Sequence, residues 1–326
     1  MTADEQMANT PRFKDRSTGL RVFGALQIAM GCCCALLILF MLLVVPSIGA
    51  HANVRMMIPA LGVYALSAVL LFTLGVGSIL ARRWARVLTL VAAWMWLVIG
   101  VTTMITMSLW MPNLSNLAAQ EKQVPPEANM IFKVVMLGTM GCMYVVIPGI
   151  FVFFYQSAHV KATCEFKNPK LSWTDNCQLP VLALSLLLGI GSVSMILSLA
   201  YGGVVPFFGF LLKGVSGGLA IVGITMLFAY LAWATYKLKM AAWWTTLAVY
   251  LVFGISTVVT FWRISMMEFY REMAFPEEQL ELIEKSGMIE AMNMPLMMGA
   301  SFAVLVGYML WVRRYFVARP AARAVS

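Results

Sequence analysis

The stretch VLTLVAAWMWLVIGVTTMITMSLWM, residues 87 to 111, decides the fold because it contains no Asp, Glu, Lys or Arg. A helix that crosses a bilayer needs about 20 consecutive, mostly apolar residues. Working outward, we find further stretches of this kind, bounded by charge, proline or glycine, at 22 to 45, 57 to 80, 130 to 156, 179 to 201, 205 to 235, 241 to 262 and 293 to 316. The sequence therefore predicts an all-α integral membrane protein with eight transmembrane helices.

The overall composition agrees with this prediction. Hydrophobic residues make up 61% of the 326 residues and charged residues 11%, against about 45 to 50% and 25% in soluble domains. A water-soluble fold is therefore excluded. The first span lacks a small-residue cleavage site, so we expect it to remain as a helix and not to be removed as a signal peptide.

The positions of Lys and Arg predict the orientation, because cytoplasmic loops carry the excess of these residues. Loops on one side of the predicted spans hold 16 of the 23 Lys and Arg residues, loops on the other side hold six, and Lys213 lies within a span. Both termini are therefore expected in the cytoplasm, in a plasma or bacterial inner membrane. The net charge of +9 follows from this topology, so no nucleic-acid partner is expected, and the bilayer is the expected partner.

Two spans resemble each other, which indicates an internal duplication. Trp96–Thr106 reads WLVIGVTTMIT and Tyr250–Thr260 reads YLVFGISTVVT. The identical pairs are Leu97 and Leu251, Val98 and Val252, Gly100 and Gly254, Thr103 and Thr257, and Thr106 and Thr260. Because each half holds an even number of spans, both halves start from the same side, and the sequence predicts two parallel four-helix repeats.

These observations divide the chain into segments. We expect a cytoplasmic tail at 1–21, a first transmembrane repeat at 22–156, a cytoplasmic linker at 157–178, a second transmembrane repeat at 179–317 and a cytoplasmic tail at 318–326. The last outer loop contains FPEEQLELIEKSG. Pro276 suits the start of a helix, Glu277 and Glu278 suit its positive end, and Gly287 suits its end. An acidic amphipathic helix is therefore expected near 276–287.

Enzyme motifs are missing from the sequence. It contains no HExxH, GxSxG, GxxxxGK[ST] or GxGxxG pattern, and the predicted topology places His51 and His159 at opposite membrane faces. These absences favour a non-enzymatic role without a cofactor, and they leave a membrane enzyme as an alternative.

The candidate site is a set of polar residues within the spans. Lys213 is the one predicted intramembrane charge, and such a residue is a functional candidate unless it reaches the interface. The repeated motif adds hydroxyl groups that would line a path for a small solute: Thr102, Thr103, Thr106, Ser256, Thr257 and Thr260. Small and hydroxyl residues also occur where membrane helices pack closely, which is the competing interpretation.

Two metal sites are conceivable, and the sequence favours neither. The linker offers His159, Cys164, Asp175 and Cys177, but it lacks the close pair of ligands typical of zinc sites. Methionines gather at the outer ends of two helices: Met104, Met107, Met111, Met294, Met297 and Met298. Thioethers suit Cu(I), whereas methionine also fills irregular gaps in packing. We expect reduced thiols and packing methionines, with no bound metal.

The sequence leaves two functions open. The first is a permease or solute-binding membrane component that uses the hydroxyl residues and Lys213. The alternative is a structural or assembly subunit of a membrane complex, which docks a protein partner through its outer acidic loop or its inner linker. Copper handling through the outer methionines remains a further alternative.

Overall fold

The computed structural model describes residues 13–47, 54–120, 126–273, 275–285, 289 and 293–323. Within these ranges, eight helical segments are long and apolar enough to cross a membrane. They are Ser17–Leu43, Met57–Ile79, Arg83–Ile105, Val134–Gln156, Leu179–Tyr201, Gly214–Tyr236, Met240–Arg263 and Met294–Val317. The structure thus supports the prediction of a helical, multi-pass membrane protein.

Contacts along the chain separate it into two compact units. Unit 1 comprises residues up to Val45 together with Val63–Asn176, and unit 2 comprises Pro46–Gly62 together with the chain from Cys177 onward. Each unit is described by itself below.

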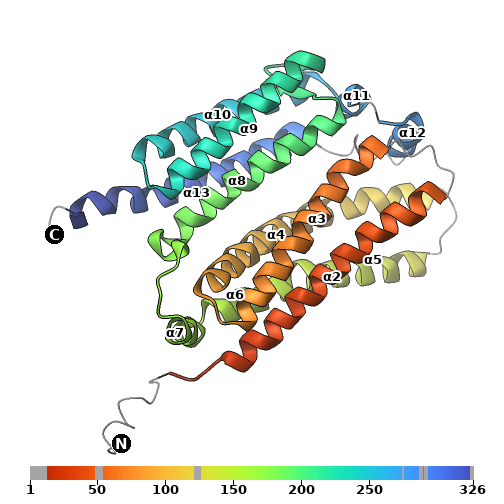
Figure 1. The fold of residues 1–326 in the computed structure, drawn as a ribbon. Coiled ribbons are helices and arrows are strands. Elements are labelled where there is room, and N and C mark those ends of the chain that lie inside the picture. The colour runs from red at the N-terminus through yellow and green to blue at the C-terminus, as the bar shows by residue number, and fades with distance from the viewer. Residues whose placement is uncertain are drawn as a thin grey trace, which may run out of the picture. The chain divides into compact units, whose positions relative to one another are not determined.

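Unit 1 is built from four apolar helical segments and the linker that follows them (Figure 1). It contains all of α2 (Ser17–Ser47) except its last two residues, α3 (Val54–Ile79) from Val63 onward, and α4 (Arg83–Gln120), α5 (Pro126–Gly141), η1 (Cys142–Val146), α6 (Ile147–Gln156), α7 (Ala158–Lys167) and η2 (Trp173–Asn176). Helix α4 extends beyond the predicted span 87–111 at both ends. The predicted linker 157–178 is therefore not a plain loop, because it contains α7 and η2.

The fourth span of unit 1 is irregular in its middle. The π-helical turn η1 separates α5 from α6, and Pro148 follows it in the first turn of α6. Proline has no backbone N–H, so the carbonyl four residues earlier, that of Tyr144, loses its regular donor. This carbonyl lies against α4, where a Cβ atom added to Gly100 would be 2.1 Å from its oxygen. Only glycine permits this approach of the two backbones.

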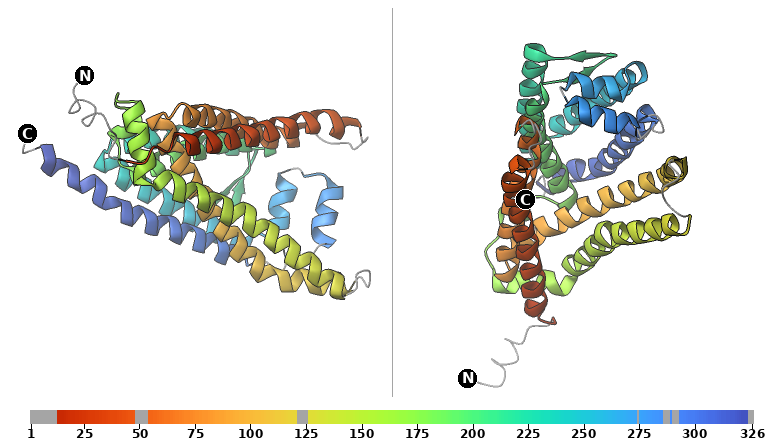
Figure 2. Two further views of the ribbon diagram at one scale, coloured as in Figure 1. Left: turned by 90° about the horizontal axis from the view of Figure 1, so that it is seen from below. Right: turned by 90° about the vertical axis from the view of Figure 1, so that its right-hand side faces the viewer.

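Unit 2 contains the remaining helices and a short hairpin (Figure 2). Its elements are α8 (Leu179–Ser198), η3 (Leu199–Tyr201), β1 (Val205–Phe207), β2 (Phe210–Leu212), α9 (Gly214–Tyr236), α10 (Met240–Arg263), α11 (Met266–Glu272), α12 (Glu277–Lys285) and α13 (Met294–Arg323). Helix α12 lies within the range 276–287 in which the sequence predicts a helix.

The prediction of a span at 205–235 is wrong at its N-terminal end. Helix α9 begins only at Gly214, and the residues before it form the antiparallel strands β1 and β2. The chain is therefore not entirely α-helical. The physical reason is local, because Pro206 and Gly209 interrupt a helix while they suit an edge strand and a tight turn.

Buried hydrogen bonds join the helices of unit 2. Ser185 and Ser192 of α8 donate to the carbonyls of Ala232 and Thr225 in α9, at 2.7 and 3.0 Å. The indole N–H of Trp243 in α10, which is fully buried, donates to a carbonyl of α13 at 2.9 Å. Since donors inside a membrane find no water, such bonds fix how neighbouring helices lie against each other.

The two units share the geometry of one turn. Ala81 and Leu238, each two residues before the first residue of α4 or α10, have positive φ angles of 50° and 57°. The next residue, Arg82 or Lys239, donates its N–H to the carbonyl five residues earlier, at 2.8 and 3.1 Å. This is the hydrogen bond of a Schellman helix end. It lets α4 and α10 start directly after the preceding helix.

Candidate functional site

The β1–β2 hairpin of unit 2 has a strained two-residue turn. Phe207 pairs with Phe210, and the two residues between them, Phe208 and Gly209, have φ angles of 42° and 97°. Positive φ at both central residues is typical of a type I′ turn, which prefers Asn-Gly. Phenylalanine is unfavourable at the first of these positions. Other contacts must therefore hold the turn in place.

Two predicted site residues on α10 provide these contacts. The Ser256 hydroxyl accepts the N–H of Phe208 at 2.9 Å and donates to the carbonyl of Pro206 at 3.3 Å. The Thr260 hydroxyl accepts the N–H of Gly209 at 3.0 Å and donates to the carbonyl of Ser256 at 2.8 Å. Both side chains are buried. They satisfy both backbone donors of the turn and fix the hairpin to α10.

The other predicted hydroxyl residues have different surroundings. Thr257 is buried within unit 2. In unit 1, Thr102 and Thr103 donate to carbonyls of their own helix, one turn earlier, each at 2.9 Å. The Thr106 side chain lies outside the described residues. The structure thus brings Ser256 and Thr260 together at the hairpin, and it gives the matched residues of unit 1 local bonds.

Lys213 does not lie inside a helical span. It precedes the first residue of α9, and its ammonium is 2.9 Å from both carboxylate oxygens of Glu272 in α11. The Lys213 side chain is 62% exposed. The prediction that Lys213 lies within a helical span is wrong for the same reason as the span 205–235, because the hairpin displaces the start of the helix.

Aromatic rings surround the hairpin, which with α11 and α12 forms what we call the hairpin cap. Phe207, Phe208 and Phe210 are 43%, 42% and 50% exposed. A second row of ring contacts connects η3, α10, α11 and the segment before α12: Tyr201–Phe275, Phe275–Tyr270, Tyr270–Phe269 and Phe269–Phe261. The hairpin cap therefore combines a hairpin that is hydrogen-bonded to α10, three exposed rings and a separate row of ring contacts.

A polar cluster closes one end of unit 1 at the turn between α3 and α4. The Asn168 amide donates to the carbonyls of Leu80 and Ala81, at 3.4 and 2.9 Å, and its side-chain oxygen accepts from Arg82 at 3.0 Å. The Asn168 carbonyl accepts from Nε of Arg83 at 2.6 Å. One asparagine thus caps the end of α3 and binds both Arg82, in the turn, and Arg83, the first residue of α4.

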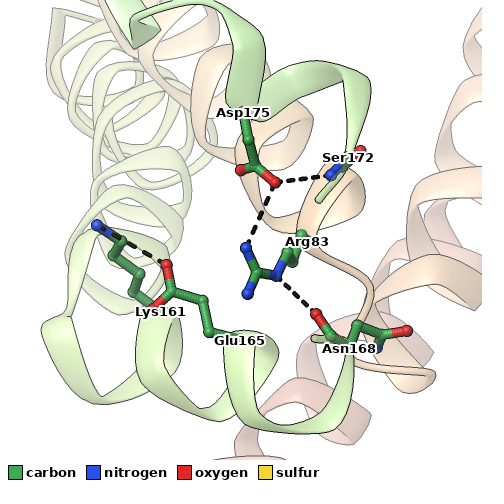
Figure 3. A network of polar contacts seen from close by, with 6 residues as sticks. All are labelled: Arg83, Lys161, Glu165, Asn168, Ser172 and Asp175. Atoms are coloured by element: carbon green, nitrogen blue, oxygen red, sulfur yellow. Dashed lines mark hydrogen bonds and ion pairs between the residues drawn. The ribbon is translucent and has the colours of Figure 1, made fainter. Parts of the chain in front are cut away.

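Figure 3 shows the Arg83 guanidinium between Asn168 and Asp175. The distance from Arg83 to the Asp175 carboxylate is 3.6 Å, and this carboxylate also accepts the N–H of Ser172 at 2.8 Å. Lys161 and Glu165 form a looser pair along α7, at 3.9 Å. We call the contacts of Asn168 and Asp175 with α4 and the preceding turn the linker clasp. Through it, the linker is bound to its own unit.

Cys164 lies beneath the linker clasp and is 1% exposed. Burial raises the pKa of its thiol to about 11, although the neighbouring Arg86 cation acts in the opposite direction. The thiolate, which is the nucleophilic form, is therefore scarcer at neutral pH than in an exposed cysteine. Among the described residues, no three His, Cys, Asp or Glu side chains are grouped as a metal site would need.

The methionine hypothesis is not tested by these contacts. Met294, Met297 and Met298 belong to the first turns of α13. The side chains of Met107 and Met111 lie outside the described residues. Copper binding by this group therefore remains a prediction.

Sequence analysis missed the hairpin and the linker clasp. Signals for the hairpin are present, since Pro206 and Gly209 lie inside the predicted span 205–235, and Gly202 and Gly203 directly precede it. The clasp has a weaker signal. The arginines near the start of α4 served only as topology markers, and nothing in the sequence pairs them with Asn168.

Comparisons with known proteins do not add a function. No protein-family model matches the sequence, and no curated protein or solved structure was found to be similar to it.

Proposed function

We propose that this chain is a non-enzymatic assembly component of a membrane protein complex, which binds a protein partner through its hairpin cap. The observation that carries this proposal is the use of Ser256 and Thr260. These hydroxyl groups were candidates for a solute path. Both are buried, and both accept hydrogen bonds from backbone N–H groups of the hairpin. A path in unit 2 would need hydroxyl groups that face the solute, so this geometry supports assembly over transport.

The hairpin cap is a better docking surface than the linker. The linker uses Asn168 and Asp175 to bind its own unit. The hairpin instead presents the exposed rings of Phe207, Phe208 and Phe210 on a fixed backbone. Aromatic residues are enriched where proteins bind each other, and a rigid backbone lowers the entropy cost of binding. The exposed carboxylates of α12 favour a partner with basic residues beside its apolar contact.

Phe208→Asn is a sharp test of this docking surface. Asparagine tolerates positive φ, so the variant removes the ring and keeps the turn. Phe166→Ser is the matched control, because Phe166 is a 61% exposed phenylalanine of the linker. We expect cross-linked native membranes to yield a stoichiometric partner with the parent chain and with Phe166→Ser, and to lose it with Phe208→Asn. A partner retained by Phe208→Asn, or a parent chain that purifies alone, contradicts the proposal.

We further propose that the units are parallel repeats and that both termini lie in the cytoplasm. Two observations support the duplication: the shared turns at Ala81 and Leu238, and the close approach of another helix to Gly100 and to Gly254. The orientation rests on the excess of Lys and Arg in one set of loops. That excess also favours a plasma or bacterial inner membrane as the location.

An impermeant thiol reagent tests the orientation. The native Cys164 and Cys177 are buried, so their failure to react would say nothing about sidedness. Cysteines introduced at Leu171 and Lys285, which have 79% exposed and 75% exposed side chains, respectively, avoid this problem. In intact cells we expect labelling of Lys285→Cys alone, and labelling of Leu171→Cys only after permeabilisation. The reverse pattern contradicts the proposed topology.

A further inference from the structure

Arg86, in the first turns of α4, is a half-buried cation with no hydrogen bond or ion pair to the described part of the chain. Its Nε atom is buried and has no hydrogen bond, and its guanidinium forms no ion pair with any residue that the structure describes. Removing a guanidinium from water is costly unless an anion or strong acceptors replace the lost hydration. An acceptor or anion for Arg86 is therefore not supplied by the residues that the structure describes.

Other charged residues near Arg86 already have partners. Arg82 and Arg83 bind Asn168, and Asp175 binds Arg83 and the N–H of Ser172. Glu165 pairs with Lys161. The carboxylates of Asp175 and Glu165 thus pair with other cations. Among the described residues, Arg82 has only the neutral Asn168 amide as its partner, and Arg86 pairs with no carboxylate.

A second buried group lies one turn away. Gln27 of α2 is 3% exposed, and its amide bonds the Thr89 hydroxyl at 3.1 Å, while its other amide atom has no partner. Thr89 is three residues after Arg86, so both lie on the same face of α4. The oxygen and nitrogen of an amide are interchangeable in assignment. In either assignment, one amide atom of Gln27 is buried and has no partner among the described residues.

We propose that Arg86 binds a phosphate group, and that this group belongs to the headgroup of an anionic phospholipid. Arg86 is the fourth residue of the segment Arg83–Ile105, which is apolar enough to span the membrane. It therefore lies at the depth where lipid phosphates are concentrated. The planar guanidinium donates two parallel hydrogen bonds to phosphate, and basic pockets among membrane helices bind lipid headgroups in this manner.

Thermal unfolding of the full chain in detergent tests this site with three additives. Phosphatidylglycerol carries the phosphate and acyl chains, diacylglycerol carries only the acyl chains, and glycerol 3-phosphate carries only the phosphate. We expect phosphatidylglycerol to raise the unfolding midpoint in a saturable manner and the other two to leave it unchanged. An equal effect of diacylglycerol overturns the phosphate site. An equal effect of glycerol 3-phosphate at the same concentration overturns the lipid as its source.

Substitutions at two arginines locate the effect. Arg86→Gln should weaken the response to phosphatidylglycerol by about ten-fold or more, because it removes charged hydrogen bonds. Arg21→Gln, at an exposed arginine of α2, removes the same charge and should leave the response unchanged. If Arg86→Gln does not fold, Arg86→Lys keeps the charge and loses the planar fork, and it should bind more weakly than the parent. A response of Arg86→Gln or Arg86→Lys equal to that of the parent overturns the proposal.

Discussion

Helix α4 of unit 1 and helix α10 of unit 2 have the same residue types at matched positions and use them in different ways. Gly100 and Gly254 each meet another helix of their own unit, where an added Cβ would lie 2.1 Å from a backbone oxygen or 2.9 Å from the Phe302 ring. The hydroxyl residues differ, since Thr103 bonds its own helix and Thr260 bonds the hairpin. Where two helices approach closely, only glycine fits. A threonine at a matched position can instead form its hydrogen bond with a different group in each unit.

The largest expected effect comes from the two glycines. Gly100→Ala should lower the free energy of unfolding by about 3 kcal/mol, because two backbones must separate, and Gly254→Ala by about 1 kcal/mol, because a phenyl ring can move. Unfolding in a denaturing-detergent titration measures both values. Gly138→Ala and Gly307→Ala are controls, since an added Cβ meets nothing within 4 Å at either position. Equal losses at Gly100 and Gly254 would remove the distinction between backbone and side-chain contact.

The hydroxyl residues should give the next largest effect. Thr260→Val leaves the N–H of Gly209 buried without an acceptor, so we expect a loss of about 1 to 3 kcal/mol. Thr103→Val in the matched helix removes only a bond to its own helix and should change stability by less than about 0.5 kcal/mol. The same titration compares the two variants. Similar losses would mean that Thr260 does not hold the hairpin.

Much of this comparison could be predicted from the sequence, and some of it could not. Continuous apolar runs predict the spans because a lipid environment demands them, and the Gly100 and Gly254 motifs identify α4 and α10 as a matched pair. The partners of Thr260 and Asn168 are 51 and 86 residues away in the chain. No local pattern encodes such pairings. The error at Lys213 has a simpler cause, since hydrophobicity alone does not distinguish a hairpin rich in phenylalanine from a helix.

The pH dependence of stability tests how completely the Cys164 thiol is buried near the linker clasp. The pKa of this thiol is raised from 9.0 to about 11, so the folded state favours the neutral thiol. This contribution to stability is fully present below pH 9 and is lost as the pH rises through 11. We expect the parent chain to lose about 1 to 3 kcal/mol more than Cys164→Ala between pH 8 and 11. Parallel pH profiles for the two proteins would show that the thiol is not buried.

Disrupting the linker clasp should lower stability by a smaller amount, and only in unit 1. Asn168→Ala removes the cap of α3 and the acceptor of Arg82, at an expected cost of about 1 kcal/mol. Trypsin should then cleave the linker faster at Lys167 and Lys170. Gln178→Ala is the control, because this residue precedes α8 without a side-chain capping bond. Unchanged cleavage of Asn168→Ala would show that the linker is held by its apolar contacts alone.

The smallest expected effect concerns Lys213, whose position distinguishes the hairpin cap from a continuous span. An exposed ion pair contributes about 0 to 1 kcal/mol, so Lys213→Met should lower stability by less than about 1 kcal/mol. Glu272→Gln should cost the same amount, and high salt should remove the difference between both variants and the parent. A lysine held inside the membrane costs about 2.5 to 3.5 kcal/mol on insertion scales. If Lys213 lay inside the membrane, Lys213→Met would stabilise the protein by a comparable amount. Such a gain in stability would contradict the hairpin and would favour the helix that the sequence predicts.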